Sequence, residues 1–205
     1  MSVLLIRHGE TALNVARVLQ PADTPLNERG LAQAEAVARR LVDMVGLRGV
    51  ITSDLPRALR TAEAIAAATG LALETTLLLH ERSFGDWRGQ PRDAFSVNPL
   101  TMAEAPPGGE SAAVFSARVA QAFALVRQRQ AALGGTLVVV THGLVIREVL
   151  ASHARLGAGV VLPLHFGNTS VTEIEAAPPH GVVLLDDTQH LEADTRDAPH
   201  GLSGG

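Results

Sequence analysis

The 205-residue sequence contains no cysteine, which excludes disulfide bonds, thiolate nucleophiles and cysteine-ligated zinc. Lysine is absent as well, because all 17 basic residues are arginine. Without lysine, the chain has neither a Schiff-base amine nor the lysine of a phosphate-binding P-loop. Histidine, arginine and the carboxylates remain as the main candidates for chemistry.

Aromatic residues are scarce, at 3% of the chain, so a core of Leu, Val and Ala is expected, as in helices packed on a sheet. The formal net charge of −4 gives no overall attraction to nucleic acid or to an anionic membrane, so any anion site has to be local. No apolar run reaches about 18 residues, and a strand-like segment begins almost at Met1. We therefore expect a cytoplasmic protein with no nucleic-acid or membrane partner.

Short apolar runs without alternation, typical of strands buried on both faces, alternate with segments of helical periodicity. Strands are predicted at 3–6, 49–52 and 136–141, and helices at about 27–45, 56–70, 110–133 and 144–154. Two more strands, at 169–174 and 182–185, flank a Pro-Pro-His-Gly turn and permit an antiparallel hairpin. The pattern predicts an α/β fold with an open, mostly parallel sheet, helices on both faces and one antiparallel edge strand.

The length fits a single domain over residues 1–191, followed by a loosely ordered tail over 192–205. Within the domain, the stretch 84–107 is rich in Gly, Pro and polar residues and is predicted to be mainly loop, with at most a short helix.

Two histidines, His8 and His142, each follow a predicted strand and precede a glycine. Ligands of open α/β sheets bind beyond the carboxyl ends of the strands, so both histidines are expected at the active site. Gly9 and Gly143 would let the backbone turn sharply and let a ligand approach closely. One such histidine alone is more often structural, but the repeated placement favours a functional site.

Two arginines accompany these histidines. Arg7 adjoins His8, and Arg57 lies near the start of a predicted helix, whose N-terminus adds backbone N–H groups and a partial positive charge. Such a cluster of nitrogen donors favours phosphate. Since histidine can be a covalent nucleophile, His8 is expected to attack phosphorus while Arg7, Arg57 and His142 bind the phosphoryl oxygens.

A leaving alkoxide also needs a proton, and Glu81 is the candidate acid. It lies just before the Gly-rich segment, where a carboxyl group close to bound phosphate would have a raised pKa. On residue type alone, a loop glutamate is more often a solvated surface group.

A series of short motifs runs through residues 3 to 191. The motifs are Leu5-Ile6-Arg7-His8-Gly9-Glu10-Thr11 with Asn14, Thr24-Pro25-Leu26 with Gly30 and Gln33-Ala34, Ser53-Asp54-Leu55-Pro56-Arg57-Ala58 with Thr61-Ala62, Glu81 with Phe84-Gly85-Asp86-Trp87 and Gly89, Pro107-Gly108-Gly109-Glu110-Ser111, Thr141-His142-Gly143, and Asp187-Thr188 with His190-Leu191. In content and order they resemble the signature of the histidine phosphatase superfamily, also called the phosphoglycerate mutase-like or branch-1 acid phosphatase group.

The resemblance implies a role for each matched residue. His8 would be the phosphorylated nucleophile, Arg7, Arg57 and His142 would bind the phosphoryl group with Asn14 as a supporting contact, and Glu81 would be the acid and base. It also implies that no metal or cofactor is needed, that the substrate is a small phosphorylated metabolite and that phosphate ion is the product. The acidic pair Asp186-Asp187 is interpreted as surface or turn structure rather than as a metal site.

The sequence departs from the family pattern at several positions. Gln20-Pro21-Ala22-Asp23 stands where many members of the family have Gln-Gly and one more residue before the Asp, which puts a backbone phosphate contact from this loop in doubt. Arg60 and Arg88 replace other residue types and are either extra anion contacts or, as we favour, surface charges. Glu110 and Ser111 either shape the pocket or cap the following helix.

Three functions are compatible with these residues. The favoured one is a phosphomonoesterase acting through phosphohistidine, and the second is a phosphoglycerate mutase that uses the same intermediate. Mutases of the family carry a longer insert with paired arginines, whereas the stretch from Gly89 to Pro107 is short and offers Arg92 alone. The third, a non-catalytic phospho-ligand binding module, would be expected to have lost a catalytic residue. The sequence leaves the identity of the substrate and the oligomeric state open.

Overall fold

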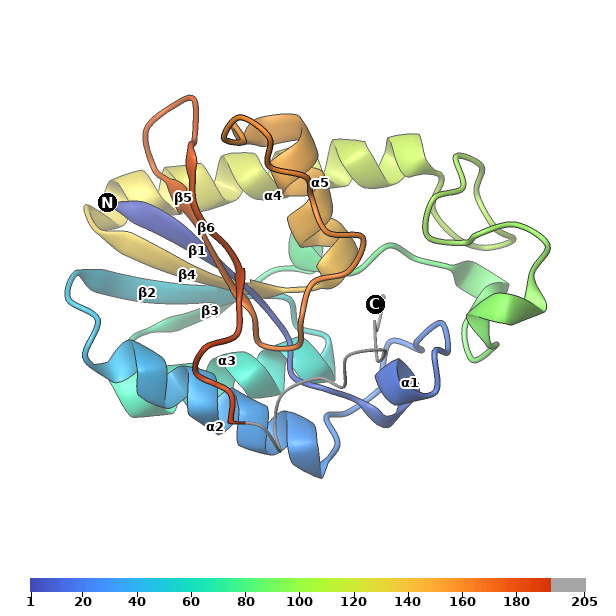
Figure 1. The fold of residues 1–205 in the computed structure, drawn as a ribbon, viewed down its shortest axis with the longest axis horizontal. Coiled ribbons are helices and arrows are strands. Elements are labelled where there is room, and N and C mark those ends of the chain that lie inside the picture. The colour runs from blue at the N-terminus through green and yellow to red at the C-terminus, as the bar shows by residue number, and fades with distance from the viewer. Residues whose placement is uncertain (193–205) are drawn as a thin grey trace.

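The computed structural model describes residues 1–192, and within them six strands form one mixed sheet (Figure 1). The strands are β1 (Ser2–Arg7), β2 (Leu47–Thr52), β3 (Leu73–Thr75), β4 (Thr136–Thr141), β5 (Val171–Glu175) and β6 (Val182–Asp187), in the spatial order β3-β2-β4-β1-β5-β6. The pairs among β3, β2, β4 and β1 are parallel, whereas β5 pairs antiparallel with β1 and β6 pairs antiparallel with β5. The predicted mostly parallel sheet with an antiparallel edge is confirmed.

Helices cover both faces of the sheet. They are α1 (Ala12–Val15), α2 (Glu28–Val42), α3 (Pro56–Thr69), α4 (Ala112–Leu133) and α5 (Gly143–His153), with 3-10 turns η1 (Leu77–Leu79), η2 (Gly85–Trp87) and η3 (Arg92–Ala94). In Figure 1, α4 and α5 lie on one side of the sheet, and α2 and α3 lie on the other. None of the helices in residues 1–192 combines the length and the hydrophobicity needed to cross a membrane.

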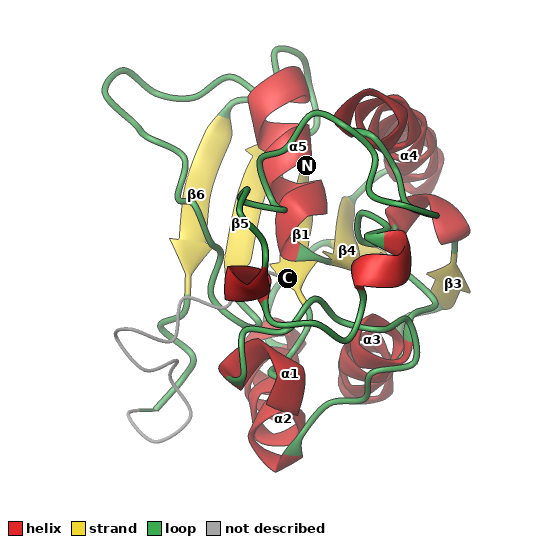
Figure 2. Ribbon diagram, turned by 90° about the vertical axis from the view of Figure 1, so that its right-hand side faces the viewer, coloured by secondary structure: helices red, strands yellow, loops and turns green. Residues whose placement is uncertain are grey.

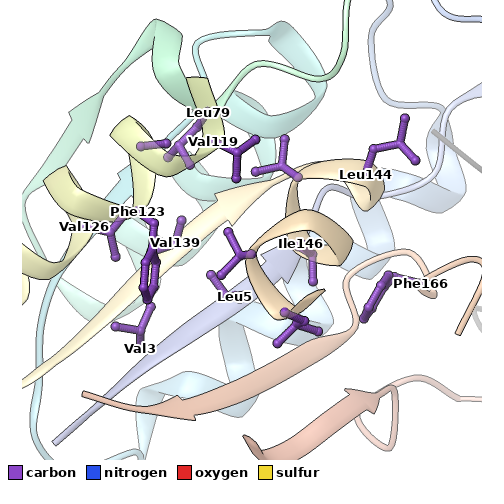
Figure 3. Packing of buried hydrophobic residues seen from close by; sticks show 14 of the residues in the cluster. Val3, Leu5, Leu79, Val119, Phe123, Val126, Val139, Leu144, Ile146 and Phe166 are labelled. Atoms are coloured by element: carbon purple, nitrogen blue, oxygen red, sulfur yellow. The ribbon is translucent and has the colours of Figure 1, made fainter. Parts of the chain in front are cut away.

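The two central strands, β1 and β4, are buried on both faces, which explains their unbroken apolar sequences. Successive side chains of a strand point to opposite faces. Val3 and Leu5 therefore pack with Val139 in the layer that contains Phe123 of α4, as Figure 3 shows. Their sequence neighbours face the other way, into a second apolar cluster under α2 and α3.

The helix α1 was not predicted, because four residues are too few to show a periodic pattern. It begins with a reciprocal cap in which the Thr11 hydroxyl accepts from the Asn14 N–H at 3.0 Å and the Asn14 side chain accepts from the Thr11 N–H at 3.1 Å. The other predicted helices differ from the observed ones by at most three residues at either end. From residue 193 on, the predicted tail lies outside the described residues.

The loop-rich segment predicted at 84–107 contains only short turns, but arginines hold it in place. Arg82 donates to three backbone carbonyls of residues 102–110 at 2.9 to 3.1 Å. Arg118 donates to three carbonyls of residues 78–81 and to the Glu110 carboxylate. These bonds fix the backbone of residues 78–81 and 102–110, whose carbonyl groups would otherwise have few partners. We call these two stretches the loop-rich wall.

The glycine at position 30, which looks unfavourable inside a predicted helix, is explained by a close approach between two backbones. A Cβ at Gly30 would lie 2.0 Å from the carbonyl oxygen of Glu10, and a Cβ at Gly9 would lie 2.5 Å from the carbonyl oxygen of Gly30. Because Gly9 has no side chain, the backbone of α2 can lie directly against it. Gln33 of the same helix accepts from the Glu10 N–H at 2.8 Å, which joins α2 to the segment after β1.

We expect Gly30→Ala to lower the free energy of unfolding by about 1–3 kcal/mol or more, although alanine normally favours a helix over glycine. The reason is that neither backbone can move without displacing the segment that follows His8. Urea unfolding of the purified variant measures this change. Glu35→Ala, on the exposed side of the same helix, is the control and should change stability by less than about 0.5 kcal/mol. A Gly30→Ala protein as stable as the parent would contradict the packing argument.

Candidate active site

The two histidines expected at the strand ends lie side by side. Arg7 and Thr141 are register partners at the ends of the parallel strands β1 and β4, and the His8 N–H donates to the Thr141 carbonyl at 3.0 Å. The imidazole rings of His8 and His142 follow directly, with centroids 5.1 Å apart and planes at 58°. Loops and short turns lie beyond this end of the sheet, as Figure 2 shows.

His8 is fully buried, and its surroundings hold it neutral with one nitrogen available. Its Nδ1 lies 2.7 Å from the carbonyl oxygen of Gly9. A carbonyl can only accept, so Nδ1 carries the proton and Nε2 carries the lone pair. Among residues 1–192, Nε2 has no hydrogen-bond partner. Burial, together with the charges of Arg57 and Arg7, holds the pKa of His8 well below its usual value and keeps the lone pair free of a proton.

His142 presents the complementary arrangement, because Ser53 binds its Nε2 at 3.0 Å. The Ser53 hydroxyl oxygen already accepts from the Leu55 N–H at 3.3 Å, so its own hydrogen is available for Nε2. When the Ser53 hydroxyl donates to Nε2, Nδ1 of His142 carries the ring proton. Nδ1 is buried and has no partner in the described part of the chain. Burial and the charge of Arg57 lower the pKa of His142, so the ring is a neutral donor. From the sequence, Ser53 was placed in a family motif and assigned no role at the site.

Two buried guanidinium groups accompany the imidazoles. Arg7 is fully buried and donates to the carbonyl of Phe166. Arg57, in the first turn of α3, is 2% exposed and donates to the carbonyls of Pro21 and Ala22 at 3.3 and 3.4 Å. Burial lowers the pKa of Arg57 to about 10, which leaves it charged at neutral pH. The site therefore holds two positive charges beside neutral histidines, an arrangement suited to a phosphoryl dianion.

Glu81 lies beside these groups and has both carboxylate oxygens bound to backbone N–H groups. One oxygen accepts from Arg82 at 2.9 Å, and the other accepts from Leu144, in the first turn of α5, at 3.2 Å. Burial raises the pKa of Glu81 and outweighs these bonds and the charges of Arg57 and Arg7. A carboxyl group with a raised pKa keeps more of its proton and can act as a general acid.

Two buried side-chain amides add candidate donors. The Asn14 oxygen accepts from Thr11 and, at 3.4 Å, from Asn168, which also donates to the His8 carbonyl at 3.0 Å. The Gln20 oxygen accepts from the Thr11 hydroxyl at 3.0 Å. Neither amide nitrogen, Asn14 Nδ2 or Gln20 Nε2, has a partner within residues 1–192. Asn14 was expected as a supporting contact, whereas the Gln20 side chain was missed because only its backbone loop had been considered.

Four residues whose roles the sequence left open now have clear surroundings. Arg60 is exposed and pairs with Glu63 at 3.3 Å, as expected of a surface charge. Arg88 is partly buried, and its charge contributes to lowering the pKa of Arg57. Ser111 caps α4, and Glu110 pairs with Arg118 at 2.7 Å, so both support the fold.

The acidic pair Asp186-Asp187, at the end of β6, also has structural partners. Asp186 accepts from the Gly167 N–H at 2.8 Å, and Asp187 pairs with Arg40 at 3.2 Å. These contacts tie the edge strand to the preceding loop and to α2. The pair thus lies at the end of strand β6 and not in a turn, and its carboxylates bind partners of the fold.

A family model of the histidine phosphatase superfamily (branch 1) matches residues 3–187. The chain belongs to this superfamily. A curated relative, phosphoglycerate mutase-like protein 4 of Arabidopsis thaliana, is 34% identical over 203 residues, covering 93% of this chain and 86% of the relative.

Solved structures show the same likeness. YhfR of Bacillus stearothermophilus superposes with a TM-score of 0.79 at 31% identity, covering 93% of this chain and 99% of that one. A mycobacterial glucosyl-3-phosphoglycerate phosphatase in complex with VO3 gives a TM-score of 0.72 at 30% identity, covering 85% and 90% of the two chains. The chain is thus similar both to a mutase-like protein and to a phosphatase.

Proposed function

We propose that the protein is a phosphomonoesterase that hydrolyses a small phosphorylated metabolite through a phosphohistidine at His8. The observation that carries the proposal is the buried Nε2 of His8, which has a lone pair, no partner in residues 1–192 and two guanidinium groups in its surroundings. Membership of the superfamily and the likeness to a phosphatase support it.

In the first step, His8 Nε2 attacks phosphorus, a bond forms between nitrogen and phosphorus, and the ester P–O bond breaks. The leaving alkoxide takes the proton of Glu81. Arg7 and Arg57 neutralise the phosphoryl oxygens, and His142 donates to them through Nδ1–H. The amide nitrogen of Asn14 would add a further donor.

In the second step, water attacks the phosphorus of the phosphohistidine. Glu81, now a carboxylate, accepts a proton from this water, and the N–P bond breaks with the electron pair returning to His8. Inorganic phosphate leaves, and the neutral imidazole and the protonated carboxyl group are regenerated. The same side chains serve both steps, so the cycle closes without a further reactant.

An activity assay tests the proposal against the mutase alternative, which the name of the Arabidopsis relative keeps relevant. Purified protein should release phosphate from p-nitrophenyl phosphate and from members of a phosphorylated-metabolite panel. The same preparation should interconvert 2- and 3-phosphoglycerate much more slowly than it hydrolyses its best substrate. Rapid interconversion with negligible hydrolysis would overturn the proposal in favour of the mutase.

A further inference from the structure

The backbone of His8 is held by two consecutive residues of the loop before β5. The His8 carbonyl accepts from the Asn168 side-chain amide at 3.0 Å and from the Thr169 N–H at 3.3 Å. On the other side of the same peptide group, the Gly9 N–H donates to the Thr61 hydroxyl at 3.0 Å. The Gly9 carbonyl, which accepts from His8 Nδ1, follows directly along the chain. Because the peptide group is planar, its orientation decides where the lone pair of His8 Nε2 points.

Thr169 adopts a backbone conformation that is unfavourable for its residue type. Its φ of 54° lies in the left-handed region, which β-branched residues rarely adopt and which persists only where the surroundings hold it. The side chain is fully buried, and its hydroxyl donates to the Asn168 carbonyl at 2.8 Å. Nε2 of His190 lies 3.1 Å from the same hydroxyl oxygen. These two contacts hold the side chain of Thr169 in place, and with it the N–H that binds His8.

His190 links Thr169 to a charged pair on the other side of its ring. Arg40 contacts Nδ1 of His190 at 3.2 Å and also pairs with Asp187 at 3.2 Å. A guanidinium can only donate, so Nδ1 accepts and Nε2 carries the proton that it donates to the Thr169 hydroxyl oxygen. Burial and the charge of Arg40 lower the pKa of His190 to about 4, against the opposing charge of Asp187. The ring is therefore neutral at pH 7 and keeps this direction of donation.

Residues 186–191, which we call the C-terminal clamp, pack against the turn before β5. In Figure 1 this part of the chain runs from β6 down to α2. A Cβ at Gly167 would lie 2.9 Å from the side chain of Thr188, and Leu191 is buried. The family motif at 187–191 lies in this clamp and has no part in the proposed mechanism. Its contact with the turn supplies a reason for the motif.

We propose that His190 is a positioning residue for the nucleophile: its hydrogen bond holds Thr169, Thr169 holds the His8 carbonyl, and the His8 ring is thereby aimed at phosphorus. The inference rests on the proposed function, because it takes His8 as the nucleophile. His190 acts through Thr169 and is assigned no contact with the substrate. Since a displacement of about 1 Å in a reacting group can cost on the order of 10²-fold in rate, loss of this support should slow the attack on phosphorus.

Single-turnover release of p-nitrophenolate, with enzyme in excess over p-nitrophenyl phosphate, tests the inference. The rate constant reached at saturating enzyme reports the step in which His8 displaces p-nitrophenolate. A variant that is merely less stable needs more protein to saturate but reaches the parental rate constant. His190→Phe keeps an aromatic ring and removes both hydrogen bonds, so it should lower the saturating rate constant about tenfold or more. His190→Gln keeps a donor and an acceptor and should stay within about threefold of the parent.

Two further variants separate this bond from general stability. Thr169→Val removes the hydroxyl and keeps the branched side chain, so it should slow the step to the same extent as His190→Phe. The double variant should be no slower than either single variant, because both remove one interaction. The control is His180→Ala, which removes another buried histidine, whose Nδ1 donates to the Glu175 carbonyl at 3.0 Å at the far end of β5. It should lower stability and leave the saturating rate constant within about twofold of the parent.

A saturating rate constant of His190→Phe within about twofold of the parent, or an equal fall in His190→Gln or His180→Ala, would overturn the positioning role. If the parent released no p-nitrophenolate, the proposed function would fail, and ¹⁵N NMR of labelled histidine would then decide the positioning role. The ring resonances of His8 should shift in His190→Phe and stay in place in His180→Ala. Unchanged resonances, or the same shift in both variants, would overturn it.

Discussion

Replacing His8 with asparagine should lower kcat/KM for every phosphomonoester on the order of 10⁴-fold or more, because it removes the nitrogen to which the proposed function assigns the covalent intermediate. Asparagine keeps a polar group next to the Gly9 carbonyl in a fully buried position, so the fold should persist. The measurement is steady-state release of phosphate, combined with acid-quench and base-quench trapping of phosphoenzyme from radiolabelled substrate. The parent should give an acid-labile, base-stable phosphoprotein, and the variant should give none.

The matched control for this change is His153→Asn, at the C-terminal end of α5 against Phe123. It removes an imidazole far along the helix from His142 and should change kcat/KM by less than about twofold. A His8→Asn protein that hydrolyses substrate at the parental rate, or that still forms a phosphoenzyme, would assign the nucleophile to another side chain.

Replacing Glu81 with glutamine should have an effect that depends on the leaving group. For an alkyl phosphate, whose alkoxide must be protonated, we expect a loss in kcat/KM of about 10²–10⁴-fold. For p-nitrophenyl phosphate, whose phenolate leaves without help, the loss in the first step should be about tenfold or less. Comparison of kcat/KM for the two substrates checks this directly. Equal losses would mean that Glu81 supports the structure through Arg82 and Leu144 rather than donating a proton.

The raised pKa of Glu81 sets the direction in which kcat/KM should change with pH. Burial raises the pKa of Glu81, so the protonated form needed in the first step persists to higher pH than for an exposed glutamate and is lost as the pH rises through the raised value. The pKa of His8 is lowered, so its lone pair stays available until the pH falls well below 6.5. The kcat/KM of the parent on alkyl phosphates should therefore decline on the alkaline side, and Glu81→Gln should lack this decline.

The sequence predicted the core of the fold well because β1 and β4 carry apolar residues on both faces and end at the same dipeptide, His-Gly. Periodicity also located α2, α3, α4 and α5. Periodicity could not locate α1, because this helix has four residues and is marked in the sequence only by the cap that Thr11 and Asn14 form. Nor could it explain Gly30, because the clash that excludes a side chain there involves Glu10, which is 20 positions away in the sequence.

For the candidate site, the strand-end rule predicted the neighbouring positions of His8 and His142. The family motifs added Asn14 and strengthened the prediction of Glu81 as the acid. The roles assigned to these residues stay predictions. What the sequence could not provide depends on three-dimensional proximity. Ser53 and His142, which are in contact, lie 89 positions apart in the sequence. The backbone hydrogen bond from the Arg92 N–H to the Arg17 carbonyl joins two irregular segments that have no periodic pattern.

The arginine bonds that hold the loop-rich wall also bear on how tightly a substrate can bind. Most proteins that close a mobile loop over a ligand lose part of the binding free energy to the conformational entropy of ordering that loop. Here Arg82 and Arg118 make their carbonyl contacts within the protein itself, over residues 78–81 and 102–110. We therefore expect the proposed substrate to lose little binding free energy to the ordering of these residues.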